Sequence, residues 1–188
     1  MGDIVTMDDL TNQEIVAVLD DAERLVPVAR GDVYLPLLQG KVLANMFFEN
    51  STRTRMSFET AMKRLGGSVL NFTSIGTSVA KGETLYDTMQ MIDGYADVAA
   101  IRHPRQGAAQ YSADAVEIPI LNAGDGAGNH PTQTMLDLFT IRQAHGTLEG
   151  LNVVLVGDLR YGRTVHSLSH ALVRFGAKLT LVSPSTLK

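Results

Sequence analysis

Short apolar runs alternate with amphipathic segments along the whole chain. The runs have the length of strands, and between them apolar residues recur at the three- and four-residue spacing of helices. We expect strands at residues 42–48, 68–73, 97–101, 119–122, 152–156 and 178–182. We expect helices at residues 8–29, 57–65, 85–96, 107–115, 131–144 and 164–175. This alternation predicts an α/β fold with a mainly parallel, doubly wound sheet.

Residues at the predicted helix ends support this pattern. Thr11 can cap the first helix, and Gly66 can end the second in a left-handed conformation. Pro131 suits the first position of a helix, which puts His130 at the N-cap and Gln133 in the first turn. Since no low-complexity linker is present, we expect a domain of residues 1–146, including the connecting helix at 131–144. Residues 147–188 would then begin a second, Rossmann-like α/β domain that is incomplete.

Composition narrows the class of protein. The chain has 188 residues, 45% of them hydrophobic and 19% charged, as in ordinary globular proteins. Its net charge of −4 gives no general reason to bind nucleic acid or an anionic membrane. Cysteine is absent, and the acidic N-terminus does not match a secretory signal. We therefore expect a cytoplasmic protein without nucleic-acid or membrane partners.

One segment concentrates hydroxyls and cations in this acidic chain. It reads FFENSTRTRMSFE and follows a buried-looking strand. The string Ser51, Thr52, Arg53 and Thr54 then lies at a helix N-terminus, where free N–H groups and the helix dipole attract anions. The alternative is that Ser51 or Thr52 only caps the helix while Arg53 and Arg55 are solvated. The whole string favours a phosphate or carboxylate site.

Other polar residues follow the ends of neighbouring strands. Arg102 and His103 come just after one strand, and His130 lies after the glycine-rich segment that follows the next. In open α/β sheets ligands bind at this edge, so Arg53, Arg102 and His130 can converge on a small phosphorylated substrate. The alternatives are a solvated turn and a structural histidine. No metal-ligand spacing is apparent.

The sequence also contains an internal repeat. The pattern from Arg53-Thr54 to Gly66 recurs, at a constant offset, from Arg163-Thr164 to Gly176, each time in a strand–loop–helix–strand context. We expect both Arg-Thr pairs to begin a helix and to face an anion. Chance combined with ordinary βαβ chemistry is the alternative.

Five segments together resemble the aspartate carbamoyltransferase family. They are FFENSTRTRMSFE, KGETLYDT, RHP, NAGDG…HPTQTMLDLFTI and VGDLRYGRTVHSL, in the family's order and spacing from about residue 40 onward. The first segment, and much of the HP-x-Q string, are shared with ornithine carbamoyltransferase. The KGET loop and the GDLRYGRTVHSL segment favour the aspartate enzyme.

The resemblance implies a reaction and a role for each site residue. The carbamoyl group of carbamoyl phosphate would pass to the amine of L-aspartate, giving N-carbamoyl-L-aspartate and phosphate for pyrimidine biosynthesis. Residues 1–146 would be the carbamoyl-phosphate-binding domain and 147–188 the start of the aspartate-binding domain. The implied carbamoyl phosphate ligands are Ser51, Thr52, Arg53, Thr54, Ser78, Arg102, His130 and Gln133. Thr77 is a second candidate for the loop hydroxyl.

Within that set, the resemblance implies that Thr54, Arg102 and His130 polarise the carbonyl while Gln133 holds the carbamoyl amide. Arg53 would bind the phosphate, Lys81 would enter the active site of a neighbouring subunit, and Arg163 would bind a carboxylate of aspartate. Neither a cofactor nor a metal is implied. The implied assembly is a homotrimer, in some members with regulatory chains. Arg55 is expected to form structural ion pairs.

Length is the main departure from the family. Its catalytic chains are longer, and their further arginine and glutamine ligands lie beyond the position of Lys188. By itself, this chain is expected to bind carbamoyl phosphate better than it catalyses transfer.

Three alternatives stay open. Residues 157–164 differ from a P-loop by one residue, Arg163 in place of lysine, which would suit a nucleoside-triphosphate-binding module. The other two are an ornithine carbamoyltransferase and a non-catalytic subunit.

Overall fold

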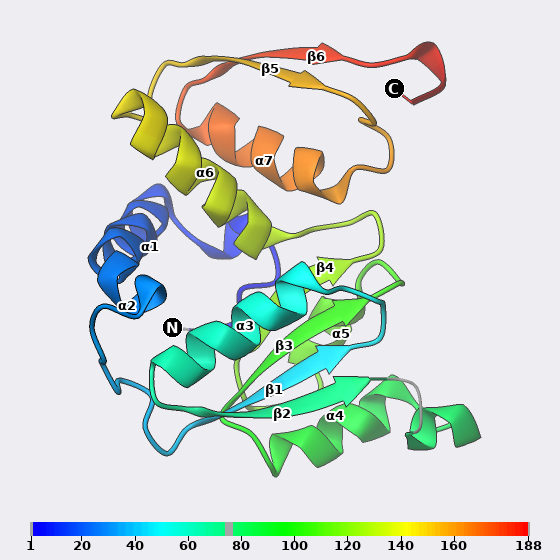
Figure 1. Cartoon of the computed structure of the whole chain (residues 1–188). Helices are drawn as coiled ribbons and strands as arrows, with labels where there is room; N and C mark the ends of the chain where they lie inside the picture. The colour runs from blue at the N-terminus through cyan, green and yellow to red at the C-terminus, as the bar shows by residue number, and fades with distance from the viewer. Residues whose placement is uncertain (1, 74–76, 188) are drawn as a thin grey trace.

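The main sheet of the protein has four parallel strands in the order β2-β1-β3-β4. The computed structural model describes residues 2–73 and 77–187 (Figure 1). The strands of this sheet are β1 (Val42–Phe47), β2 (Ser68–Thr73), β3 (Val98–His103) and β4 (Ile120–Asp125). A second parallel sheet pairs β5 (Asn152–Val156) with β6 (Lys178–Val182).

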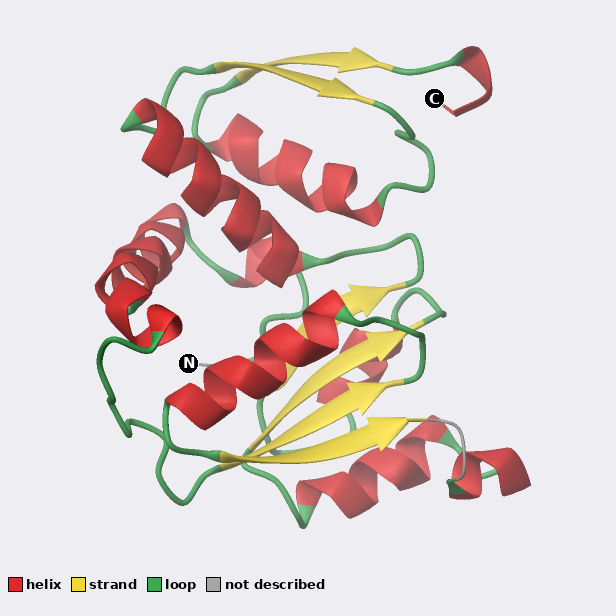
Figure 2. Ribbon diagram, in the orientation of Figure 1, coloured by secondary structure: helices red, strands yellow, loops and turns green. Residues whose placement is uncertain are grey.

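Helices cover both faces of the main sheet, so the doubly wound prediction is confirmed for it. Figures 1 and 2 show α3 on one face and α4 and α5 on the other. α6 runs from the main sheet towards the second sheet, and α7 lies on the face of the second sheet that α6 approaches. The helices are α1 (Asn12–Arg24), α2 (Val26–Arg30), α3 (Arg53–Arg64), α4 (Leu85–Asp93), α5 (Ala108–Ala113), α6 (Pro131–His145) and α7 (Arg163–Arg174), with 3₁₀ turns η1 (Met7–Asp9), η2 (Ser78–Lys81) and η3 (Ser185–Leu187). No helix in the described part of the chain has the length and apolar character to cross a bilayer.

Several predicted boundaries were wrong for local reasons. The helix expected at 8–29 is divided into η1, α1 and α2. Leu10 has an extended backbone, with φ −121° and ψ 135°, and ends η1, while Pro27 near the start of α2 cannot donate the backbone hydrogen bond that would continue α1. The third strand does not end at residue 101. Phe47 of β1 pairs with Arg102, so Arg102 and His103 are the last residues of β3 rather than part of a turn beyond it.

Two larger hydrophobic clusters hold the elements together. One lies between the main sheet and α4 and α5, with Met46, Met89 and Ile101 fully buried. The other joins α1, α6 and α7, with Ile15 and Leu138 fully buried. Burying one such side chain contributes about 1.5–3 kcal/mol. The second cluster fixes α6 and α7 at the carboxyl edge of the main sheet.

The internal repeat is a repeat of structure. α3 and α7 have the same length of 12 residues, and they begin at the equivalent residues Arg53 and Arg163. The pairing of Val42 with Ser68 between β1 and β2 recurs in the second copy as Asn152 with Lys178 between β5 and β6. Arg53-Thr54 and Arg163-Thr164 therefore occupy the same first turn of equivalent helices, as expected.

The N-terminal segment joins the two sheets. Ile4 forms a parallel bridge with Leu121 of β4 and exchanges backbone hydrogen bonds with Ile120 and Asn122. Residues 7–12 then contact the C-terminal end of α7, where Arg174 donates to the carbonyl oxygens of Met7 and Leu10. This segment thus connects the edge of the main sheet to the last turn of α7.

Candidate active site

The N-termini of three helices meet at one cavity. Its volume is about 740 Å³, and it lies at the carboxyl edge of the main sheet, where α3, α6 and α7 begin. α3 contributes Arg53 and Thr54, α6 contributes Thr132 and Gln133, and α7 contributes Arg163 and Thr164; Asn50, Ser51, Thr52, Ser57, Phe58, Ala61, Arg102, His130 and Leu136 complete the lining. Helix N-termini carry free N–H groups and a positive partial charge, so this cavity favours an anion.

The segment before α3 is not an ordinary side-chain cap. Thr52 occupies the N-cap position of α3 but makes no capping hydrogen bond, and its backbone is already helical, with φ −83° and ψ −54°. Arg53 is exposed, and among the described residues it forms no ion pair. Capping by Thr52 therefore does not explain these residues. They present a hydroxyl, a guanidinium and helix N–H groups to the cavity.

Arg102 and Arg163 converge on the carboxylate of Glu49. Arg163 Nη2 lies 3.0 Å from Glu49 Oε1, and Arg102 Nη2 lies 3.3 Å from the same oxygen. Although burial opposes it, hydrogen bonds and charge from the two arginines hold the pKa of Glu49 below its ordinary value. Glu49 thus joins the end of β1 to the first turn of α7.

His130 is buried between these cations as a neutral imidazole. Only 5% of the residue is exposed, and burial, together with the charges of Arg102 and Arg163, lowers its pKa to about 4. Its ring Nδ1 lies 3.3 Å from the hydroxyl oxygen of Thr132, and its backbone N–H donates to Ser167 Oγ of α7 at 3.1 Å. A neutral ring in this place can donate one hydrogen bond to a ligand without adding charge.

Gly124 allows the three groups to come together. Its φ is +114°, and a Cβ there would lie 3.0 Å from Arg163 Nη1, 3.3 Å from His130 Cδ2 and 3.4 Å from Arg102 Nη1. Any other residue would be strained and would crowd all three side chains. The glycine at this position is therefore part of the site.

Two of the predicted site residues lie away from this cavity. Ser78 and Lys81 are exposed on η2, which follows β2 at the outer edge of the main sheet. Within their own chain they do not line the cavity. The expected ion pairs of Arg55 were wrong: none lies within 4 Å in the described ranges, and its Nε is buried without a partner.

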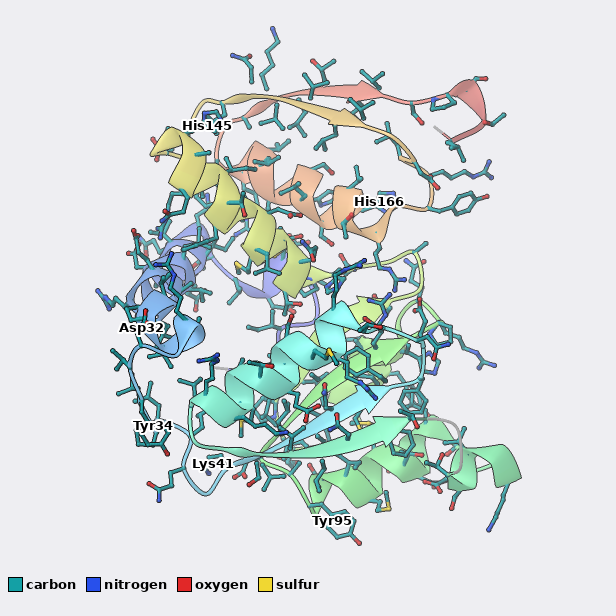
Figure 3. The ribbon with its side chains drawn as sticks, viewed as in Figure 1. Asp32, Tyr34, Lys41, Tyr95, His145 and His166 are labelled. Atoms are coloured by element: carbon teal, nitrogen blue, oxygen red, sulfur yellow. The ribbon has the colours of Figure 1, made fainter. Side chains whose placement is uncertain are left out.

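The loop of residues 157–164 does not offer a phosphate cradle. Asp158 Oδ1 accepts hydrogen bonds from the backbone N–H groups of Arg160 (3.0 Å) and Tyr161 (2.9 Å). The donors that would hold a nucleotide phosphate are thus directed at a carboxylate. Beside this loop, the ring nitrogens of His166 lie 3.2 Å from the carbonyl oxygen of Ala127 and 2.7 Å from that of Leu159 (Figure 3).

Sequence reasoning missed three residues of this arrangement: Glu49, Gly124 and Ser167. Glu49 is an acidic residue immediately before a string of cations, which was a signal for a charge partner. Gly124 is in the glycine-rich segment, where no local pattern shows which glycine faces a ligand. Ser167 lies one turn after Arg163, and only the packing of α7 against the Asn129 side chain and the His130 backbone N–H brings it to the site.

Comparison with known proteins gives the family. Residues 2–143 match the family model described as "Aspartate/ornithine carbamoyltransferase, carbamoyl-P binding domain". The chain belongs to this family. It is 52% identical over 188 residues to the aspartate carbamoyltransferase catalytic subunit of Archaeoglobus fulgidus, covering 100% of this chain and 63% of that protein. It is 55% identical over 186 residues to that of Methanothrix thermoacetophila, covering 98% and 60%.

Solved structures of the family share the fold. The catalytic subunit of M. jannaschii aspartate transcarbamoylase matches with a TM-score of 0.92 and 49% identity, over 100% of this chain and 62% of that one. Aspartate transcarbamoylase from Trypanosoma cruzi, in complex with carbamoyl phosphate and aspartate, matches with a TM-score of 0.95 and 45% identity, over 99% and 59%. The chain thus spans about three fifths of the length of these relatives.

Proposed function

We propose that this chain is the carbamoyl-phosphate-binding part, with the beginning of the aspartate-binding part, of an aspartate carbamoyltransferase of pyrimidine biosynthesis. The observation that carries the proposal is the cavity where three helix N-termini meet Arg53, Arg102 and Arg163. Relatives of about 50% identity that carry this name support it. The division between residues 146 and 147 is part of the proposal.

In the proposed reaction the phosphate of carbamoyl phosphate binds Ser51, Thr52, Arg53 and Thr54 at the start of α3. Thr54, Arg102 and neutral His130 donate hydrogen bonds to the carbonyl oxygen, on which negative charge grows as the aspartate amine attacks. The Thr132 hydroxyl can donate to His130 Nδ1, which leaves the Nε2 proton for the substrate. The C–N bond forms, the C–O bond breaks with its electron pair passing to the phosphate oxygen, the amine nitrogen gives up a proton to the departing phosphate, and phosphate leaves towards Arg53.

Arg163 binds a carboxylate of aspartate in this proposal, which requires exchange of its contact with Glu49 for the substrate. The position of Lys81 on η2, at the outer edge of the sheet, supports a role at a neighbouring subunit, with Ser78 beside it. The assembly we propose is a homotrimer in the cytoplasm, with regulatory chains as possible partners. Sedimentation equilibrium should give a mass three times that of the chain, with a monomer mass contradicting the assembly.

Titration calorimetry with carbamoyl phosphate tests the substrate. We expect saturable binding that is lost in Arg53→Ala and kept in Arg24→Ala, which removes an exposed arginine at the end of α1 that pairs with Asp21. Binding of ATP with Mg²⁺ in place of carbamoyl phosphate would support a P-loop at residues 157–164 instead. An unchanged affinity in Arg53→Ala would contradict the placement of the phosphate at α3.

The aspartate enzyme and the ornithine enzyme differ in the amine that accepts the carbamoyl group. The cavity is lined by cations, which favour the second carboxylate of L-aspartate over the side-chain ammonium of L-ornithine. Phosphate release with L-aspartate is expected, and release with L-ornithine alone would favour the other enzyme. Tight binding of carbamoyl phosphate without release of phosphate from either amine would favour a non-catalytic subunit.

A further inference from the structure

Gln133 makes one polar side-chain contact within the described chain. It is the third residue of α6 and lines the cavity beside His130. Its Nε2 donates to Oδ1 of Asp137, one helical turn further on, at 3.0 Å. In the part of the chain that the structure describes, no group donates to Gln133 Oε1, and the Asp137 carboxylate accepts no second hydrogen bond. The two side chains therefore form an isolated pair at the cavity wall.

The chemistry of this pair decides which end of the amide faces Asp137. A carboxylate only accepts hydrogen bonds, whereas the two ends of a glutamine amide have nearly the same shape and opposite polarity. Turning the amide by 180° would set its oxygen against the carboxylate oxygen, with no proton between them. Asp137 thus holds the NH₂ group of Gln133 and leaves Oε1 as the free end.

Gln133 Oε1 is an acceptor in a cavity where donors are numerous. The arginines of the lining only donate and the helix N-termini present N–H groups, whereas the lining hydroxyls can donate or accept and Asn50 carries the other amide. An acyl phosphate is held by these donors through its phosphate and carbonyl oxygens, whatever its acyl substituent. The acceptor of Gln133 pairs only with a substituent that carries N–H, which a carbamoyl group has and an acetyl group lacks.

We propose that Asp137 is a positioning residue that keeps the carbonyl oxygen of Gln133 towards the cavity and so makes the site prefer carbamoyl phosphate to acyl phosphates without an N–H group. The proposal rests on the proposed function and deepens it, because it assigns the discrimination of the substrate to a residue outside the cavity lining.

A purely helical role is the simpler explanation, since a Gln-to-Asp pair at this spacing also stabilises isolated helices. The chain offers a matched example in Gln110 and Asp114, joined by the same kind of bond at 2.9 Å. That pair is exposed, so water can satisfy either partner. Asp137 is half-buried, and burial raises its pKa although the bond from Gln133 opposes this. A half-buried carboxylate with a single hydrogen-bond partner is not explained by helix stabilisation alone, which favours a role in orienting Gln133.

The test compares the dissociation constants of carbamoyl phosphate, acetyl phosphate and inorganic phosphate by titration calorimetry. Asp137→Asn keeps the shape but can donate, so Gln133 can turn its NH₂ group to the cavity. We expect the preference for carbamoyl over acetyl phosphate to fall about tenfold, the effect of one hydrogen bond of about 1.4 kcal/mol, with phosphate affinity within about twofold of wild type. Asp114→Asn, the matched control, should change none of the three.

A second variant separates positioning from general structure. Gln133→Ala should lose the same preference, and adding Asp137→Asn to it should change the preference no further. Wild-type discrimination in Asp137→Asn would overturn the inference and leave the proposed function intact. So would an equal loss of affinity for all three ligands, or equal binding of carbamoyl and acetyl phosphate by the wild type. Failure of the wild type to bind carbamoyl phosphate would overturn the proposed function itself, and the inference with it.

Discussion

Replacing Arg174 by methionine should destabilise the protein far more than an ordinary substitution near the surface. Its Nη1 donates to the Met7 carbonyl oxygen at 2.7 Å, its Nη2 to the Leu10 carbonyl oxygen, and its Nε to Asn12 Oδ1 at 2.9 Å. Met7 and Leu10 are only 2% and 5% exposed, so water cannot readily replace these donors. Methionine keeps most of the apolar stem, which confines the change to the hydrogen bonds.

The magnitude follows from those three bonds. A hydrogen bond to a charged group contributes about 1.5–3 kcal/mol, and bonds in one network are not additive. With the Arg174 side chain 26% exposed, we expect a loss of about 3–4 kcal/mol in the free energy of unfolding. For a chain of this size that lowers Tm by roughly 10 °C.

The repeat supplies the control. Arg64 of α3 is the counterpart of Arg174 in the internal repeat, but within the described ranges its guanidinium makes a single hydrogen bond, to the Val28 carbonyl oxygen at 3.2 Å. Arg64→Met should therefore cost about 1 kcal/mol. Urea denaturation of both variants and the wild type, with the slopes compared, measures the difference. If Arg174→Met cost no more than Arg64→Met, the N-terminal segment would not depend on this arginine, and our reasoning would be refuted.

Three further predictions concern the cavity. NMR of labelled histidine should show His130 neutral down to about pH 4. Because only the unfolded chain takes up this proton between about pH 6.5 and 4, the free energy of unfolding should decline as pH falls through that range. A titration midpoint of His130 near pH 6.5 would contradict the burial argument. The lowered pKa of Glu49 means that its ion pairs with Arg102 and Arg163 stabilise the fold above about pH 4.5, and that this stabilisation is lost as pH falls through the lowered pKa of the folded state. The urea midpoint of Glu49→Gln should therefore change less than that of wild type between about pH 5 and 3. Equal changes in the two proteins would refute this. Gly124→Ala should weaken carbamoyl phosphate binding by at least about tenfold. The reasons are that strain at positive φ costs about 1–3 kcal/mol and that the new methyl group crowds three side chains of the cavity. An unchanged affinity in titration calorimetry would contradict this prediction.

The period of the apolar residues was enough to predict the strands. Residues 68–73, 152–156 and 178–182 were predicted with the observed bounds, because each is a short run rich in apolar residues that glycine or other turn-forming residues bound, although none of the three strands is fully buried. The ends of β3 and β4 were not predicted. Arg102 and Asp125 are polar residues held in strands by pairing with their neighbours, and that tertiary cause leaves no local pattern.

The residues of the candidate site were likewise only partly predictable from the sequence. Arg53, Arg102 and His130 could be brought together from the sequence because parallel strands end at one edge of a sheet. Glu49 could not be assigned, since its role depends on Arg163, which is distant in the sequence and belongs to the other sheet's first helix. The relation of Gln133 to Asp137 was within reach of helical spacing, but only the burial of the cavity wall distinguishes that pair from the exposed Gln110 and Asp114.

The segment at residues 3–12 has a consequence for the order in which the chain acquires its structure. It is synthesised before its partners, which are Ile120 and Asn122 of β4 and Arg174 at the end of α7. While β1, α3 and β2 can form from neighbouring sequence, the apolar side chains of Met7 and Leu10 must wait until α7 has been made. Until then the apolar side chains of this otherwise acidic segment are exposed to solvent, and its capture closes the longest loop in the described molecule.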